Sequence, residues 1–169
     1  MVRRASGPAA PPRTATEGSV RVSEMTTPGV PGEGRPDLLR GGVPAASFFD
    51  QIGGHETFVR LVDVFYQGVA EDPVLRPMYP EEDLEPAKRR LTMFLEQYWG
   101  GPGTYSAERG HPRLRMRHMP YKVNPEARDR WLAHMRTGVD ALGLPPLQEA
   151  TLWDYLERAA HSLVNSFED

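Results

Sequence analysis

The chain has 169 residues, 39% of them hydrophobic, a formal net charge of −3 and no cysteine. This length predicts one domain with room for a substantial core, and a chain with this charge has no general attraction for nucleic acid or anionic lipid. The lack of cysteine excludes disulfides, thiolate metal ligands and a cysteine nucleophile, and it agrees with the reducing cytoplasm, where we expect the protein to reside.

The first 46 residues differ from the rest in composition. They contain seven prolines, seven glycines and no aromatic residue, so they cannot bury enough apolar surface to offset the entropy lost on folding. We therefore predict a disordered tail over residues 1–46 and a folded domain over residues 47–169. The tail has arginines but no apolar run, so we expect no secretory signal. No stretch is apolar for the roughly twenty residues of a transmembrane helix.

Two long helices are predicted in the first half of the domain. Ser47 can cap a short turn over residues 48–52, which a glycine pair ends. The helix that follows has an apolar stripe at helical spacing, formed by Phe58, Leu61, Val62, Phe65 and Val69. After two X–Pro breaks, a second long helix is expected from about Glu85 to a second glycine pair. Its apolar stripe consists of Ala87, Leu91, Phe94, Leu95 and Tyr98.

Two more helices are predicted in the second half. Asn124 precedes Pro125, which combines a capping side chain with proline at the first helical position. This helix is expected to end at Gly143. After a Pro–Pro pair, a final helix has an apolar stripe of Leu152, Leu156, Ala159 and Leu163. No segment shows the sustained alternation of apolar and polar residues typical of a strand, so the sequence predicts an all-α fold.

The stretch RGHPRLRMRHMPYKV, residues 109–123, contains four arginines, one lysine and two histidines. Arg113, Arg115 and Arg117 are two residues apart. On a helix such neighbours point about 200° apart, because one turn takes ~3.6 residues. Arg115 would therefore leave the face shared by the other two. Since the stretch also lacks an aromatic platform and the domain is acidic, we predict no nucleic-acid site.

One histidine of this stretch is predicted to face inward. Leu114, His118 and Tyr121 have i, i+4 and i+7 spacing and share one face of a helix. On spacing alone, a core histidine bonded to a carbonyl is the commoner explanation, and a single axial ligand to a large apolar cofactor is the alternative. No multi-histidine metal site is predicted, because the remaining histidines show no His-x-x-x-His spacing. They are His55, His111, His134 and His161.

The order of these segments, together with several long strings, resembles the truncated haemoglobins, shortened globins with a two-over-two helical sandwich. The strings are SFFDQIGGHETF, FYQGVAEDPVLRPMYPEEDL, RLTMFLEQYWGGPGTYSAERGHPRLRMRH and YLERAAHSLVNS. The resemblance covers about residues 47–167. The run FLEQYWGGP followed by RGHPRLRMRH is similar to the group II branch in particular. It implies an all-α truncated globin fold around haem.

The resemblance aligns His118 with the family's proximal ligand to the haem iron. A histidine-ligated haem b is consistent with a chain that has no cysteine. Such a haem is held by apolar contact, by the bond to iron and by pairing of its propionates. Leu91 and Phe94 are therefore expected to wall the pocket. Arg90 and Arg117 are the candidate propionate partners, because a guanidinium matches a carboxylate.

On the opposite side of the iron the resemblance places Tyr66, Tyr79 and Trp131. Their O–H and N–H groups would donate hydrogen bonds to a bound diatomic ligand that carries partial negative charge. Ala87 aligns where many ordinary globins have a distal histidine. A small side chain there cannot donate a hydrogen bond, which agrees with the group II pattern, in which tryptophan and tyrosines take over this role.

The resemblance implies a haem protein that binds O2 and other diatomic ligands such as NO and CO. Two uses stay open: oxygen binding for sensing, transfer or storage, and redox chemistry as a nitric oxide dioxygenase or a peroxidase. Turnover would need an electron-donating reductase, which the sequence does not identify. A homo-oligomer also stays open, since the family often self-associates. The alternative function is a non-haem helical interaction domain that docks a partner through its basic strip, residues 109–123.

Overall fold

The computed structural model describes residues 44–167. The predicted disordered tail lies outside the described residues except for residues 44–46, which are exposed and belong to no helix. Between residues 44 and 167 the chain forms α-helices and one 3-10 turn and no strand, which confirms the predicted all-α fold. In the same range no helix is long and apolar enough to cross a membrane.

The elements in chain order are α1 (Phe48–Gln51), α2 (Gly54–Glu71), the 3-10 turn η1 (Arg76–Met78), α3 (Glu85–Tyr98), α4 (Thr104–Arg109), α5 (Leu114–His118), α6 (Pro125–Leu142) and α7 (Pro146–Leu163). Several predicted helix ends are confirmed. Ser47 and Asp50 form a reciprocal capping box at α1. The Asn124 side chain accepts from the backbone N–H of Ala127 at 2.9 Å, and Gly143 ends α6 in the left-handed conformation.

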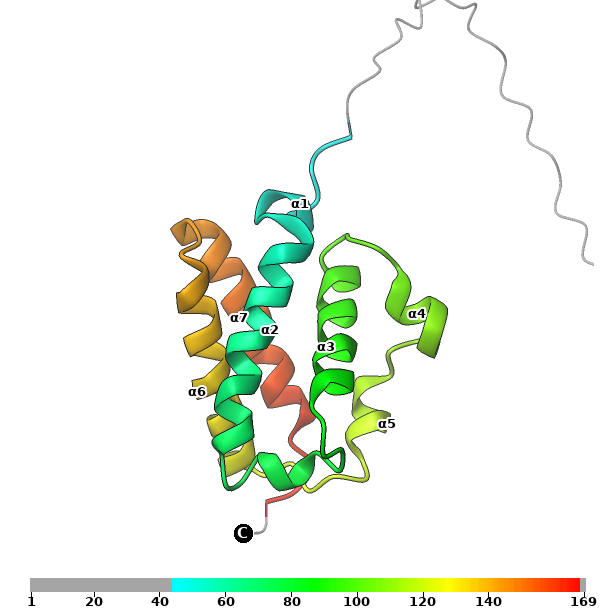
Figure 1. The fold of residues 1–169 in the computed structure, drawn as a ribbon, viewed down its shortest axis with the longest axis vertical. Helices are drawn as coiled ribbons and strands as arrows, with labels where there is room; N and C mark the ends of the chain where they lie inside the picture. Colours follow the sequence, from blue (N-terminus) through cyan, green and yellow to red (C-terminus); the bar gives the residue numbers. More distant parts are fainter. Residues whose placement is uncertain (1–43, 168–169) are drawn as a thin grey trace, which may run out of the picture. The chain divides into compact units, whose positions relative to one another are not determined.

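The long helices form two packed pairs, α2 with α3 and α6 with α7. Helix α2 packs on α6 and on α3, and α6 packs on α7. In Figure 1, α6 lies on one side of α2 and α3 on the other, with α4 and α5 beyond α3, while α7 passes behind α2. The core between the pairs consists of fully buried residues from α2, α3, α6 and α7, the largest being Phe58, Phe65, Leu61, Leu95, Met135, Leu152 and Leu156.

Two glycines allow α2 and α6 to approach closely. A Cβ atom on Gly138 of α6 would lie 3.0 Å from the backbone oxygen of Leu61 in α2. A Cβ atom on Gly68 of α2 would collide with the ring of His134 in α6. The space that an alanine side chain would need is therefore taken by Leu61 at Gly138 and by the His134 ring at Gly68, and these contacts fix the spacing of the two helices.

Two sequence expectations differ from the structure. Tyr98, assigned to the apolar stripe of α3, is 52% exposed and stacks on Tyr155 of α7 at 3.9 Å between ring centroids. Position 98 is the last residue of α3, where the helix leaves the core, and the neighbouring Trp99 packs on Phe48 instead. The sequence predicts no helix between the glycine pair after α3 and residue 109, whereas the structure has α4 there. It has a single buried residue, Tyr105, and so no apolar periodicity that could reveal it.

Candidate functional site

A cavity of about 590 Å³ lies among the helices, and its lining residues come mainly from α2, α3, α5, α6 and α7. This volume is typical of sites for small molecules and cofactors. The cavity brings together all nine residues that the resemblance assigns to a haem site, and they are Tyr66, Tyr79, Ala87, Arg90, Leu91, Phe94, Arg117, His118 and Trp131. Their common location is a property of the fold, whereas their roles toward a cofactor stay predictions.

His118 is the last residue of α5 and lines this cavity. Its Nδ1 atom lies 2.7 Å from the backbone oxygen of Leu114. A carbonyl oxygen only accepts hydrogen bonds, so Nδ1 carries the proton and Nε2 presents a lone pair. This is the tautomer of a neutral imidazole ligand whose second nitrogen is oriented by a backbone carbonyl. The two interpretations of His118 are therefore compatible, because each uses a different ring nitrogen.

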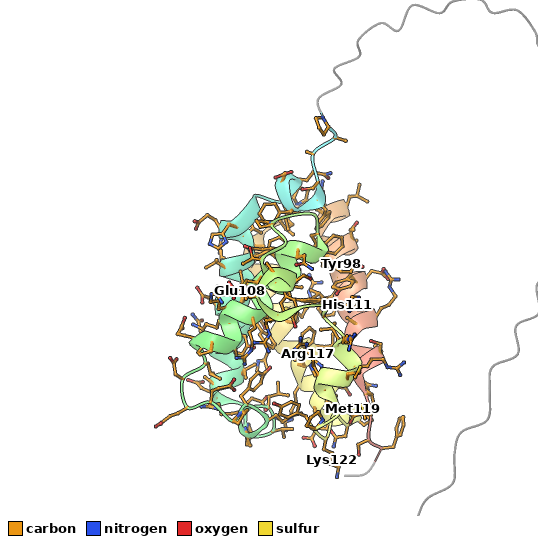
Figure 2. The ribbon with its side chains drawn as sticks, turned by 90° about the vertical axis from the view of Figure 1, so that its right-hand side faces the viewer. Tyr98, Glu108, His111, Arg117, Met119 and Lys122 are labelled. Carbon is orange, nitrogen blue, oxygen red and sulfur yellow. The ribbon has the colours of Figure 1, made fainter. Side chains whose placement is uncertain are left out.

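The loop before α5 is held by Arg117. Its Nε atom donates to the backbone oxygen of Pro112 at 2.8 Å, and Nη2 donates to that of Arg109 at 2.8 Å. Arg113, which directly precedes α5, has a left-handed backbone with φ of 41°, and this costs about 1 kcal/mol for a residue other than glycine. Figure 2 shows His111, Arg117 and Met119 following one another along this face. Arg117 therefore positions the loop, and two of its donors are already used there.

Arg90 also lines the cavity and is already paired. Its Nη2 atom donates to Oε1 of Glu81 at 2.6 Å, and both side chains are about one-third exposed. The hydrogen bond from Arg90 lowers the pKa of Glu81. A propionate bound at Arg90 would share the guanidinium with Glu81. Arg109 and Arg128 also line the cavity, although no sequence pattern marks them as site residues.

Tyr66, Tyr79 and Trp131 form an aromatic cluster on one part of the cavity wall. The rings of Tyr66 and Tyr79 meet edge to face at 5.5 Å between centroids. Phe65 contacts both Tyr66, at 4.9 Å, and Trp131, at 5.3 Å. Burial raises the pKa of Tyr66, and the neighbouring Tyr79 hydroxyl adds to this effect. Burial raises the pKa of Tyr79 as well. Both phenols therefore stay protonated and keep an O–H donor.

Two side chains hold the irregular segment that carries Tyr79. The buried carboxylate of Asp72 accepts from the backbone N–H groups of Val74 and Leu75, each at 2.9 Å, and from His134 Nε2 at 2.8 Å. The Arg76 guanidinium donates to the backbone oxygen of Tyr79 at 3.0 Å, and to those of Glu81 and Glu82. Tyr79 lies outside any helix, so these polar contacts replace helical bonds in positioning its ring.

Asp72→Asn should destabilise the protein in a pH-dependent manner. Burial alone would raise the pKa of Asp72, but hydrogen bonds from Leu75, His134 and Val74 and the charge of Arg130 lower it from 3.8 to about 2. This difference corresponds to about 2 kcal/mol of stability, since a tenfold change in proton affinity is worth about 1.4 kcal/mol. Because the folded-state pKa is depressed, the contribution is complete above pH 3.8 and is lost as the pH falls toward 2.

Urea unfolding at pH 7 and pH 3 measures this contribution. We expect the wild type to exceed Asp72→Asn by about 2 kcal/mol at pH 7 and by about half of that at pH 3. Asp154→Asn is the control, because Asp154 is exposed and its only ion pair in the described part of the chain is with Arg158 on its own helix. A difference for Asp72→Asn that does not change between the two pH values would show that the carboxylate's charge is not the cause.

A family model, curated relatives and solved structures all show which protein family the chain resembles. The model of the bacterial-like globin family matches residues 47–165. The group 2 truncated haemoglobin YjbI of Bacillus subtilis is 42% identical over 115 residues, which are 68% of this chain and 86% of that protein. The chain belongs to the group II truncated haemoglobins.

Solved structures agree with this membership. The thermostable haemoglobin of Thermobifida fusca is 63% identical, with a TM-score of 0.72 over 73% of this chain and 100% of that one. The truncated oxygen-avid haemoglobin of Bacillus subtilis is 40% identical, with a TM-score of 0.67 over 71% of this chain and 100% of that one. The predicted family and its group II branch are therefore confirmed, and the chain is a haem-binding globin.

The cavity fits a haem by its own chemistry. It offers an imidazole nitrogen with a free lone pair on His118, apolar walls such as Leu91 and Phe94, and arginines at its margin. Family membership also removes the non-haem interaction domain as an interpretation of the basic strip. Within that strip Arg113 and Arg115 are exposed, whereas Arg117 is partly buried at the cavity. The three arginines do not form one continuous charged face.

Sequence reasoning missed part of the cavity wall. Tyr105 of α4 and Tyr155 of α7 line it, and neither was singled out as a site residue. Tyr105 lies in the helix that the sequence did not reveal. Tyr155 directly precedes Leu156, a residue of the predicted stripe of α7, so its helical position could have suggested a place near the core.

Proposed function

We propose that this truncated haemoglobin binds O2, and also NO and CO, at a haem b held by His118. The observation that carries the proposal is the pairing of two features in one cavity. One is His118, with its Nδ1 proton bound to the Leu114 carbonyl and its Nε2 lone pair available. The other is the cluster of Tyr66, Tyr79 and Trp131, which carries protonated donors. The oxygen-avid relative from Bacillus subtilis supports the choice of ligand.

The bond between His118 and Leu114 prepares the histidine for its proposed role. It fixes the ring orientation, and because its acceptor is an oxygen with negative partial charge, it increases the electron density on Nε2. A ferrous haem supplies the centre at which a diatomic ligand binds and acquires negative charge. Leu91 and Phe94 contribute apolar surface that keeps water away from the ligand.

The distal cluster supplies hydrogen bonds to the ligand. Each donor is expected to contribute about 1–3 kcal/mol toward a partly charged acceptor. Among residues 44–167 no group accepts from the Trp131 indole N–H, so this donor is available to a ligand. Ala87, 3% exposed, adds neither a hydrogen bond nor bulk at this wall. Several donors acting together slow the release of O2. Slow release argues against simple oxygen storage, which requires that O2 be given up readily.

Redox chemistry is the second use that this cluster favours. Donors in a buried site stabilise negative charge that develops on oxygen when an O–O bond is rearranged or broken. This would suit a nitric oxide dioxygenase, which converts NO and O2 to nitrate, or a peroxidase. Either activity requires an external electron donor, for which we propose a reductase.

Spectroscopy with rapid mixing tests the proposed function. Purified protein supplemented with haem should give one haem per chain and a Soret band, and its reduced form should bind O2 and release it slowly. Mixing that form with NO under a reductase system should yield nitrate over many turnovers if the protein is a dioxygenase. A protein that remains colourless after haem supplementation would contradict the proposal. Tight O2 binding without nitrate would leave binding or sensing as the function.

A further inference from the structure

Helix α5, which presents His118 to the cavity, is too short to be stable by itself. It spans five residues, Leu114–His118, whereas isolated helices shorter than about a dozen residues are marginal in water. None of its residues is fully buried. Its position must therefore come from contacts with the rest of the fold. On its N-terminal side Arg117 supplies such contacts by binding the carbonyls of Pro112 and Arg109.

On the C-terminal side one asparagine makes the corresponding contacts. Asn165 follows the end of α7, and its Nδ2 atom donates to the backbone oxygens of His118 at 3.1 Å and Tyr121 at 3.0 Å. Its Oδ1 atom accepts from the backbone N–H of Val123 at 3.0 Å, and its own N–H donates to the Val123 oxygen at 2.9 Å. We call Asn165 with these four hydrogen bonds the Asn165 clamp.

The Asn165 clamp joins two walls of the cavity. His118, Tyr121 and Val123 line it from the segment around α5, and Leu163 lines it from the last turn of α7. The His118 oxygen belongs to the end of a helix, where carbonyls lack intrahelical partners. It receives the Tyr121 N–H at 3.0 Å and the Asn165 amide. The carbonyl of the proposed iron ligand is therefore tied directly to the segment that follows α7.

The chemistry of the Asn165 clamp is specific to asparagine. Its side chain uses two donors on Nδ2 and one acceptor on Oδ1 at the same time. Aspartate would keep the acceptor but lose both donors, and alanine would lose all three side-chain bonds. Asn165 is exposed, so replacing it leaves no cavity in the core. Variants at this position are therefore expected to fold.

We infer that Asn165 is a positioning residue for His118, which fixes the height and tilt of the imidazole in the cavity and so tunes its bond to iron. This inference rests on the proposed function, because it takes His118 as the iron ligand. Asn165 does not touch the cavity itself and acts only through the backbone of residues 118–123.

The test compares Asn165→Ala and Asn165→Asp with the wild type in the haem-loaded, ferrous, ligand-free protein. The iron–histidine stretching band in resonance Raman spectra should shift and broaden in both variants, and transfer of haem to an excess of apomyoglobin should be several-fold faster. Hydrogen exchange of the Val123 backbone N–H distinguishes loss of the Oδ1 acceptor of Asn165 from loss of its Nδ2 donors. It should accelerate in Asn165→Ala but remain slow in Asn165→Asp, where the acceptor oxygen is kept.

Ser162→Ala is the matched control, because Ser162 is exposed and, among residues 44–167, its hydroxyl bonds only to Ala159 of the same helix. It should leave all three readouts unchanged. If the wild type itself shows no iron–histidine band, the proposed function fails, whatever the Val123 exchange shows. If the wild type shows the band and both Asn165 variants reproduce its frequency, width and haem transfer rate, the positioning role of Asn165 is overturned.

Discussion

His118→Ala is expected to lose most of its haem. The variant removes the only nitrogen ligand that the resemblance assigns to iron and leaves apolar contact and propionate pairing as the remaining attractions. The bond between Nδ1 and the Leu114 oxygen disappears with the ring. Haem content per chain, measured from the Soret band and from iron analysis, should fall well below one. Any haem that is retained should lack the five-coordinate ferrous spectrum.

His111→Ala is the matched control for this experiment. His111 lies in the same stretch, residues 109–123, but it is exposed and does not line the cavity. Within the described part of the chain its ring accepts only a long hydrogen bond, from the Arg113 N–H at 3.3 Å. Its haem content and spectrum should equal those of the wild type. A fully loaded, spectrally unchanged His118→Ala protein would mean that another residue is the proximal ligand.

Trp131→Phe should release O2 about tenfold faster or more. The substitution removes the indole N–H but keeps an aromatic ring to pack beside Phe65. The lost hydrogen bond to a partly charged ligand is worth about 1–3 kcal/mol, and each 1.4 kcal/mol corresponds to about a factor of ten. Stopped-flow displacement of O2 by CO measures the rate. The association rate should change less, because the donor acts after the ligand has entered.

Trp153→Phe provides the comparison for Trp131→Phe. Trp153 lies on α7, stacks with the Arg136 guanidinium at 4.9 Å, and does not line the cavity. The two substitutions make the same chemical change, so only the one inside the cavity should affect O2 release. Equal rates for both variants and the wild type would show that Trp131 has only a packing role.

Local signals in the sequence account for much of the fold. The capping residues Ser47 and Asn124 and the glycine that follows α6 act within a few residues of themselves, so their effect is visible in the string. Helix α4 has no such pattern and was missed. Tyr98 was assigned to the core because helical spacing reports a face of the helix, but not how far along the helix the core extends.

The candidate site depended on the resemblance far more than the helices did. Tyr66, Tyr79 and Trp131 are aromatic residues like any others when taken singly, and only a fold brings them together at one cavity. The polar contacts that position the site are also invisible in the string. Asn165 acts on residues more than 40 positions away, and no local pattern announces such a pair.

The close packing at Gly68 has a consequence for how sequence variation in this protein should be interpreted. A methyl group at Gly68 would press on the His134 ring. This ring donates a hydrogen bond to the Asp72 carboxylate, and that carboxylate binds the backbone of the turn that leads to Tyr79. Gly68 does not line the cavity. A change of one hydrogen to one methyl at a residue outside the cavity wall is therefore expected to alter ligand affinity, so the residues that set the behaviour of the pocket extend beyond those that line it.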